Sequence, residues 1–156
     1  MTRSADVATI SGSDFSGVFN QNQGTLIVEC STFSDTGLSA VAISDGTSNN
    51  RIQILPWSSR QGQVVTGGVD QCLFDNGSLT AGQIVKIGLA YAGNDCALSM
   101  NGAVPATDGS VSLPTVDRMN IGANGAGTGS FLNGHIRSIR YYPERLSNEM
   151  LQELSA

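Results

Sequence analysis

The fold of this chain is decided by its closing stretch, residues 118–154, which reads RMNIGANGAGTGSFLNGHIRSIRYYPERLSNEMLQEL. Residues 118–122 have the pattern of a short strand that ends in glycine, and 123–129 form a glycine-rich turn. A long alternating strand follows over 131–142, and a short helix over 147–154 ends the stretch. Two strands around a glycine-rich turn, followed by a terminal helix, form an ending that most fold classes lack.

The expected helix has its own start signals. Ser147 can accept hydrogen bonds from the first free amide groups as an N-cap. Leu146 and Leu151 can meet as a hydrophobic staple across that cap. Glu149 lies in the first turn, where the helix dipole favours a negative charge. Since a helix of two turns is unstable alone, we expect it to pack on the rest of the domain.

Composition limits the classes of function. The chain has 156 residues, which is the usual size of one domain. Charged residues make up 13%, about half the usual share, and the net charge is −5 with a single lysine, Lys86. Nucleic-acid binding needs clustered basic side chains, so we expect no nucleic-acid partner. No apolar stretch is long enough to span a bilayer, so we expect no membrane partner.

Alternating apolar residues predict strands along most of the chain. They are expected over 25–32, 39–44, 51–55, 62–66, 69–74, 83–91, 96–100 and 103–106. Gly67-Gly68 and Asn101-Gly102 are typical of tight hairpin turns, which need positive φ angles. Turn signals every 8–12 residues favour an all-β sandwich or barrel. Residues 1–24 are interpreted as an arm packed on a single domain over 25–156, with a short strand near 7–10.

The three cysteines, Cys30, Cys72 and Cys96, lie in apolar strand contexts without a Cys-x-x-Cys motif. An odd number argues against a complete disulfide framework. We therefore expect three buried thiols in a protein that folds in a reducing cytosol.

The sequence resembles a known family in two places. Residues 97–102, Ala-Leu-Ser-Met-Asn-Gly, are similar to a strand and turn of concanavalin A-like, laminin-G-like jelly rolls. The runs 119–122, 131–136 and 141–147 are similar to the ending of those domains. The resemblance implies an all-β jelly-roll sandwich of two antiparallel sheets with one short C-terminal helix.

A subset of that family, found at the end of bacteriophage tail and other virion structural proteins, is more similar still. The similarity lies in residues 2–8, 24–29, 44–47 and 49–52. It implies a terminal module of a larger structural polypeptide, made in the cytoplasm of a bacterial host and incorporated into the virion. Its implied work is attachment, with a glycan or host-surface receptor as partner. The alternative is an assembly or decoration module that contacts other virion subunits, as a homo-oligomer such as a trimer.

Catalytic signatures are missing from the sequence. The related glucanases carry acidic residues two positions apart on one strand, and no two acidic residues here have that spacing. His135 is the only histidine, and there is no Gly-x-Ser-x-Gly motif. We therefore predict a non-enzymatic module. A glycan hydrolase that pairs carboxylates from different strands is the remaining alternative.

Five residues are candidates for ligand binding. Trp57 is the only tryptophan, and its ring could stack on a sugar or cap the core. Arg51 follows Asn49 and Asn50, and could bind a ligand or a loop carbonyl. Arg60 lies close to Trp57 in sequence and joins the same candidate site.

Calcium is a possible cofactor because related sandwiches hold it with loop carboxylates and carbonyls at one rim. Asp45 and Asp95 are the candidate ligands. Both also suit ordinary turns, where aspartate is common.

Overall fold

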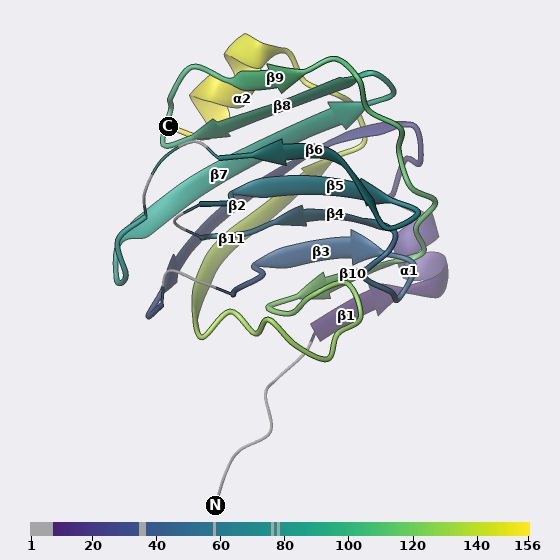
Figure 1. Ribbon diagram of the computed structural model, residues 1–156, viewed down its shortest axis with the longest axis horizontal. Coiled ribbons are helices and arrows are strands. Elements are labelled where there is room, and N and C mark those ends of the chain that lie inside the picture. Colours follow the sequence, from purple (N-terminus) through teal and green to yellow (C-terminus); the bar gives the residue numbers. More distant parts are fainter. Residues whose placement is uncertain (1–7, 35–36, 58, 76, 78) are drawn as a thin grey trace, which may run out of the picture.

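The computed structural model describes residues 8–34, 37–57, 59–75, 77 and 79–156. Two antiparallel sheets stack face to face, as Figure 1 shows. The six-stranded sheet consists, in spatial order, of β1 (Ala8–Ser11), β10 (Arg118–Ile121), β3 (Val41–Ser44), β4 (Arg51–Ile54), β5 (Gly62–Thr66) and β6 (Val69–Phe74). The five-stranded sheet consists of β11 (Gly134–Tyr142), β2 (Gln23–Thr32), β7 (Ile84–Ala92), β8 (Asp95–Met100) and β9 (Ala106–Asp108). The predicted all-β jelly-roll sandwich is confirmed.

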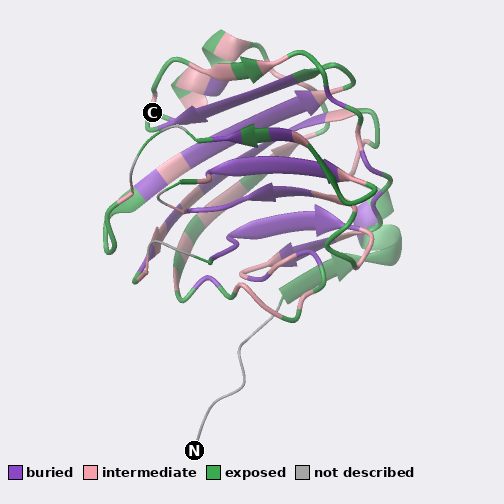
Figure 2. Cartoon of the chain, in the orientation of Figure 1, coloured by how far each residue is buried: buried purple, intermediate pink, exposed green. Residues whose placement is uncertain are grey.

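The core lies between the two sheets, where the inner strands are buried along most of their length (Figure 2). Leu26, Val28 and Cys30 of β2 enter it together, as their alternation predicts. Ile27 faces the other way, onto a smaller cluster beneath the C-terminal helix. β2 therefore follows the two-residue period of a pleated sheet.

The C-terminal helix α2 (Asn148–Leu154) closes this smaller cluster. Its predicted cap is present, because the Ser147 hydroxyl accepts a hydrogen bond of 3.3 Å from the Met150 amide. Leu151 is fully buried against Ile27. Gly88 leaves room for this contact, since a Cβ there would lie 2.7 Å from Leu151 Cδ1.

Most strand boundaries lie within two residues of those expected, but β11 and β9 begin three residues later. β11 begins at Gly134 rather than at residue 131, because Ser130 and Asn133 adopt positive φ angles of 50° and 45°. Extended strand cannot include that conformation. β9 lies at residues 106–108 instead of 103–106, after the Asn101-Gly102 turn.

The first described residues join the sandwich. β1 pairs with β10, and a short helix that the sequence analysis does not predict, α1 (Gly12–Ser16), follows it. Phe15 of α1 is buried in the core and stacks on Phe19 with ring centres 4.5 Å apart. Residues 1–7 of the expected arm lie outside the described residues. None of the described helices has the length and apolar character needed to cross a bilayer.

Candidate functional site

The outer face of the six-stranded sheet carries polar side chains at its centre. Gln53 lies between Ile52 and Ile54 on β4, so its side chain points away from the core that those two residues enter. Gln63 is its partner on β5 in the sheet register. Both glutamines are nevertheless buried, which means that neighbouring segments cover this part of the sheet.

A hydrogen-bond network holds these amides in place. Gln63 Oε1 accepts bonds from Gln53 Nε2 at 2.7 Å and from Arg51 Nη2 at 3.2 Å. Gln63 Nε2 donates to Asp70 Oδ1 on β6 at 2.5 Å. A network of partly buried polar groups with satisfied partners is rigid, so it forms a defined floor.

The glycine-rich loop over residues 122–130 folds across the same face and forms one wall. Asn120 Nδ2 donates to the carbonyls of Asn124 at 3.0 Å and Gly125 at 2.9 Å. The Ser44 hydroxyl donates to the Gly125 carbonyl at 2.7 Å. Glycine is required at 125, because a Cβ there would lie 2.5 Å from the Thr47 carbonyl oxygen.

The segment between β4 and β5 forms the opposite wall. The indole Nε1 of Trp57 donates to the Leu38 carbonyl, which fixes the ring at the rim. The Arg60 guanidinium carbon lies 5.7 Å from the centre of that ring, within the range of a cation–π contact. Residues 38–39 link the two walls, because Leu38 accepts the bond from Trp57 and the Ser39 amide donates to the Ser130 carbonyl at 2.8 Å.

Between the walls lies a pocket of about 130 Å³, which we call the polar pocket. Its lining includes Ser39, Arg51, Gln53, Trp57, Arg60 and Gln63. The Ser39 hydroxyl is fully buried and has no hydrogen-bond partner among the described residues. A buried hydroxyl without a partner is costly, so this group is available to a ligand.

The charge of the polar pocket is positive. Arg51 and Arg60 line it, no described carboxylate does, and neither arginine forms an ion pair with another described residue. Burial lowers the pKa of Arg51; nearby Asp70 opposes this effect and Arg60 adds to it. Arginine stays protonated even so, and two guanidinium groups without a carboxylate between them favour an anionic ligand.

Three of the five predicted ligand-binding residues, Arg51, Trp57 and Arg60, therefore lie together in one pocket. The structure places Asn49 and Asn50 beside it, in the turn before β4. The Asn50 side chain accepts a hydrogen bond from the Gly67 amide at 2.9 Å, and the Asn49 carbonyl accepts one from the Gly68 amide at 2.8 Å. These two asparagines join the β3–β4 turn to the β5–β6 hairpin.

Ser39, Gln53 and Gln63 are pocket residues that the sequence pattern does not predict. The sequence does hint at the two glutamines, because each is a polar residue in a predicted strand whose other residues are mostly apolar. This hint is weak, since a polar residue on an outer face is ordinary in any antiparallel sheet. Nothing in the sequence indicates that a loop 60 residues later covers that face.

The candidate calcium ligands do not meet. Asp45 lies in the β3–β4 turn of one sheet, where its carboxylate accepts bonds from the Thr47 amide, the Thr47 hydroxyl and Asn50. Asp95 begins β8 in the other sheet and pairs with Arg145 at 2.9 Å. The described residues hold no group of three His, Cys, Asp or Glu side chains that could bind a metal. These two aspartates do not fit a shared calcium site.

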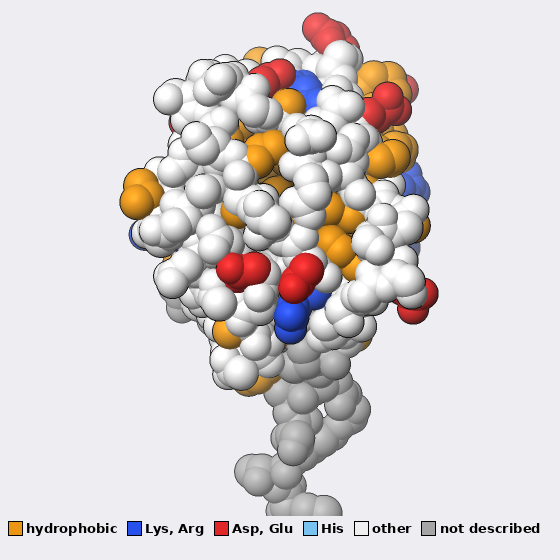
Figure 3. All heavy atoms as spheres, turned by 90° about the vertical axis from the view of Figure 1, so that its right-hand side faces the viewer, with side chains coloured by type: hydrophobic (Ala, Val, Ile, Leu, Met, Phe, Trp, Pro, Cys, Tyr) orange, Lys and Arg blue, Asp and Glu red, His pale blue; other side chains and the backbone are white. Residues whose placement is uncertain are grey.

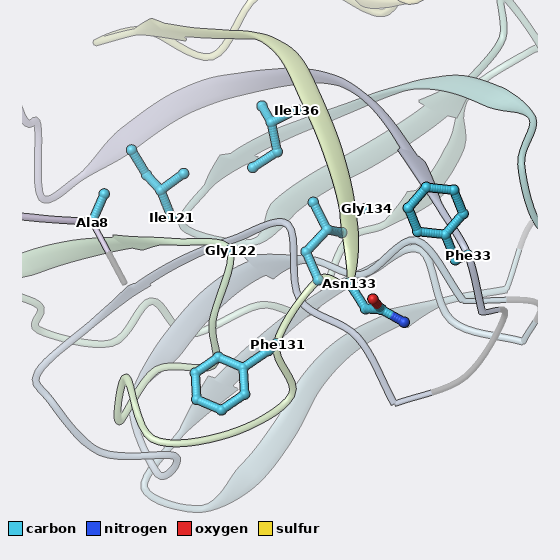
Figure 4. A pocket seen from close by; sticks show the side chains of 9 residues that line it. Ala8, Phe33, Ile121, Gly122, Phe131, Asn133, Gly134 and Ile136 are labelled. Atoms are coloured by element: carbon cyan, nitrogen blue, oxygen red, sulfur yellow. The ribbon is translucent and has the colours of Figure 1, made fainter. Parts of the chain in front are cut away.

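A larger hollow of about 590 Å³ lies at the open side of the sandwich, between β1, β10 and β11 (Figure 4). We call it the apolar groove; its lining includes Ala8, Phe33, Ile121, Phe131, Asn133 and Ile136. Phe33 and Phe131 are 64% and 37% exposed. Asn133 is the one amide side chain in this lining, so the groove offers little to orient a polar ligand.

The face of the molecule in Figure 3 carries few charged side chains among the described residues. Apolar side chains on this face are scattered among uncharged polar atoms. The described ion pairs are isolated: Arg118 with Asp117, Arg137 with Glu29, and the pair at Arg145. An acidic ligand would therefore meet its strongest local attraction where two cations converge.

Comparison with known proteins gives no sequence relative but several structural ones. No protein-family model matches the chain, and no curated protein matches it. The carbohydrate-binding module CBM40 of the Ruminococcus gnavus IT-sialidase superposes with a TM-score of 0.71 at 18% identity, over 87% of this chain and 84% of that one. The same module bound to α2,3-sialyllactose gives a TM-score of 0.69 at 17% identity, over 88% and 84%.

Two further solved structures have the same fold. Domain 4 of AbnA, an extracellular arabinanase of Geobacillus stearothermophilus in complex with arabinotriose, gives a TM-score of 0.67 at 16% identity, over 90% of this chain and 69% of that one. A heptameric SAP-like pentraxin from Limulus polyphemus gives 0.66 at 13% identity, over 97% and 82%. At these identities the similarity shows the jelly-roll fold.

Proposed function

We propose that this protein is a non-catalytic carbohydrate-binding module, and that the polar pocket binds a glycan with an acidic substituent. One observation carries the proposal. Arg51 and Arg60 converge beside Trp57 and the unpaired hydroxyl of Ser39, in a pocket with no described carboxylate in its lining.

The chemistry of a sugar acid suits these groups. A guanidinium binds a carboxylate or sulfate through two parallel hydrogen bonds, which fix its orientation. The indole of Trp57 offers an apolar surface beside the charge, and the Ser39 hydroxyl offers a polar contact at the pocket wall. Ligand sites commonly combine a few such polar groups with aromatic surface.

The volume of the polar pocket limits how much of a glycan it can hold. The polar pocket is smaller than the roughly 300 Å³ at which pockets enclose drug-sized molecules. It therefore suits the end of a glycan, with the remainder lying across the surface. Two structural neighbours are named in complex with glycans, the acidic sialyllactose and the neutral arabinotriose.

The biological setting belongs to the same proposal. The resemblance of residues 2–8, 24–29, 44–47 and 49–52 to bacteriophage virion modules supports an attachment role in a virus particle. In that role the module would be made in the host cytoplasm, incorporated into the virion and used to bind a host-surface glycan.

The test compares an acidic with a neutral glycan. We expect the protein to bind 3′-sialyllactose more tightly than lactose by isothermal titration calorimetry. Arg60→Gln and Arg51→Gln should each lower that affinity about 10- to 100-fold, the loss of one charge-assisted hydrogen bond. The matched control is Arg140→Gln, which replaces an exposed arginine on the other sheet and should leave the affinity unchanged.

Two outcomes would refute the proposal at different levels. Equal affinity for lactose and 3′-sialyllactose, or unchanged affinity in both arginine variants, would refute the binding of an acidic glycan in the polar pocket. Failure to bind any member of an array of acidic and neutral glycans would remove carbohydrate binding itself.

Subunit attachment is the second candidate function, and the apolar groove favours it. Exposed aromatic rings beside an apolar hollow are typical of protein contacts. A homo-oligomer, such as a trimer, would be seen by light scattering, and Phe33→Ser should dissociate it. A monomer at all concentrations would exclude self-assembly through this groove.

A further inference from the structure

Two of the three buried cysteines face each other across the sandwich. Cys72 lies on β6 and Cys96 on β8, in different sheets, and their sulfur atoms are 3.0 Å apart. Both side chains belong to the core, with Cys72 3% exposed and Cys96 fully buried. We propose that Cys72 and Cys96 form an inter-sheet disulfide when the protein folds in an oxidising environment.

The geometry needs little adjustment. A disulfide holds its sulfurs 2.03–2.05 Å apart, so these two would approach by about 1 Å. All three cysteines are unbridged in the structure, and the short sulfur–sulfur contact joins Cys72 to Cys96. The bond would join residues 24 positions apart, and would tie the edge strand β6 to the opposite sheet.

The reaction is a thiol–disulfide exchange with a low-molecular-weight disulfide such as oxidised glutathione. One cysteine thiolate attacks that disulfide, forms a mixed disulfide and releases one glutathione thiol. The second cysteine then attacks the protein sulfur of the mixed disulfide and releases the other. The two cysteines lose two protons and two electrons, and oxidised glutathione gains them as two thiols.

The disulfide can form only when the two cysteines are accessible to the oxidant. Contact with Cys72 and burial both raise the pKa of Cys96, so its thiol stays protonated in the closed sandwich. The reactive thiolate therefore forms before the sheets close, or when β6 separates. The position of β6 favours its separation, because β6 is an edge strand with exposed Val69 and Leu73.

Trypsin gives a direct test, because it places each cysteine in a different peptide. Cleavage after Arg3, Arg51, Arg60, Lys86 and Arg118 puts Cys30 in residues 4–51, Cys72 in 61–86 and Cys96 in 87–118. We refold the full chain in a glutathione buffer at the redox potential of the endoplasmic reticulum, block free thiols and digest without reductant. The expected product is peptide 61–86 linked to 87–118, with Cys30 alkylated.

Stability gives a second measurement. Closing a loop of this length should raise the melting temperature of the oxidised protein by roughly 10 °C over the reduced one. Cys30→Ser should keep that difference, and Cys72→Ala should abolish it. Recovery of all three cysteines as alkylated peptides from folded wild-type protein would overturn the proposal, whether or not the Cys72 variant folds.

Discussion

Truncating Leu151 to alanine tests whether α2 is an integral part of the sandwich. The side chain is fully buried against Ile27 and Gly88, and its neighbours cannot close the space because they belong to paired strands. Buried leucine-to-alanine changes cost 2–5 kcal/mol, and we expect about 3 kcal/mol here. For a chain of this size that loss lowers the melting temperature by roughly 6–12 °C.

The measurement is urea unfolding followed by circular dichroism, with Met150→Ala as the matched control. Met150 is the preceding residue of the same helix and is 44% exposed, so its truncation should change stability by less than about 0.5 kcal/mol. If Leu151→Ala costs no more than Met150→Ala, then α2 does not pack as described, and the second cluster contributes nothing to stability.

Two further predictions concern single positions. Asp45 has a pKa below its usual value: slight burial raises it, but hydrogen bonds from Thr47 and Asn50 together outweigh that effect. The contribution of Asp45 to stability is therefore present above the unfolded pKa of about 3.9, and it is lost as the pH falls through the lower pKa of the folded state. Between neutral and strongly acidic pH, the melting temperature of Asp45→Asn should therefore fall less than that of the wild type. An identical fall in the two proteins would contradict this prediction. Gly134→Ala should destabilise by about 2 kcal/mol or more in urea, because its Cβ would lie 2.0 Å from the Ser31 carbonyl oxygen. Gly93→Ala, whose Cβ meets nothing within 4 Å, should be nearly neutral, and equal losses in the two variants would argue against the β11–β2 pairing.

The strands were predictable because their signal is local. Alternation in β2 and β7 sets both the strand and its buried face, and Asn101-Gly102 adopts the positive φ angles of 50° and 72° that its hairpin needs. The start of β11 was not predictable in this way. Asn133 and Ser130 look like ordinary strand or loop residues, and their left-handed backbone depends on how the preceding loop crosses the sheet.

The site was predictable only in part, for the same reason. Arg51, Trp57 and Arg60 are close in sequence and carry unusual chemistry, so composition alone drew attention to them. Ser39 and Gln63 became pocket residues through strand order and through the loop over 122–130, which is distant in sequence. Side chains that act by position, more than by type, need the tertiary structure to be recognised.

Strand β6 connects the proposed pocket with the proposed disulfide. Its Asp70 accepts the hydrogen bond from Gln63 that holds the pocket floor, and Cys72, two residues later, faces the opposite sheet through the core. An edge strand is bonded to one neighbour only, so β6, like β1 at the other edge, can separate more easily than the inner strands of this sheet. A disulfide at Cys72 would restrain that motion from the core side and so keep Asp70 against Gln63. Oxidation would then favour a pre-formed pocket, although neither sulfur touches the ligand-binding groups.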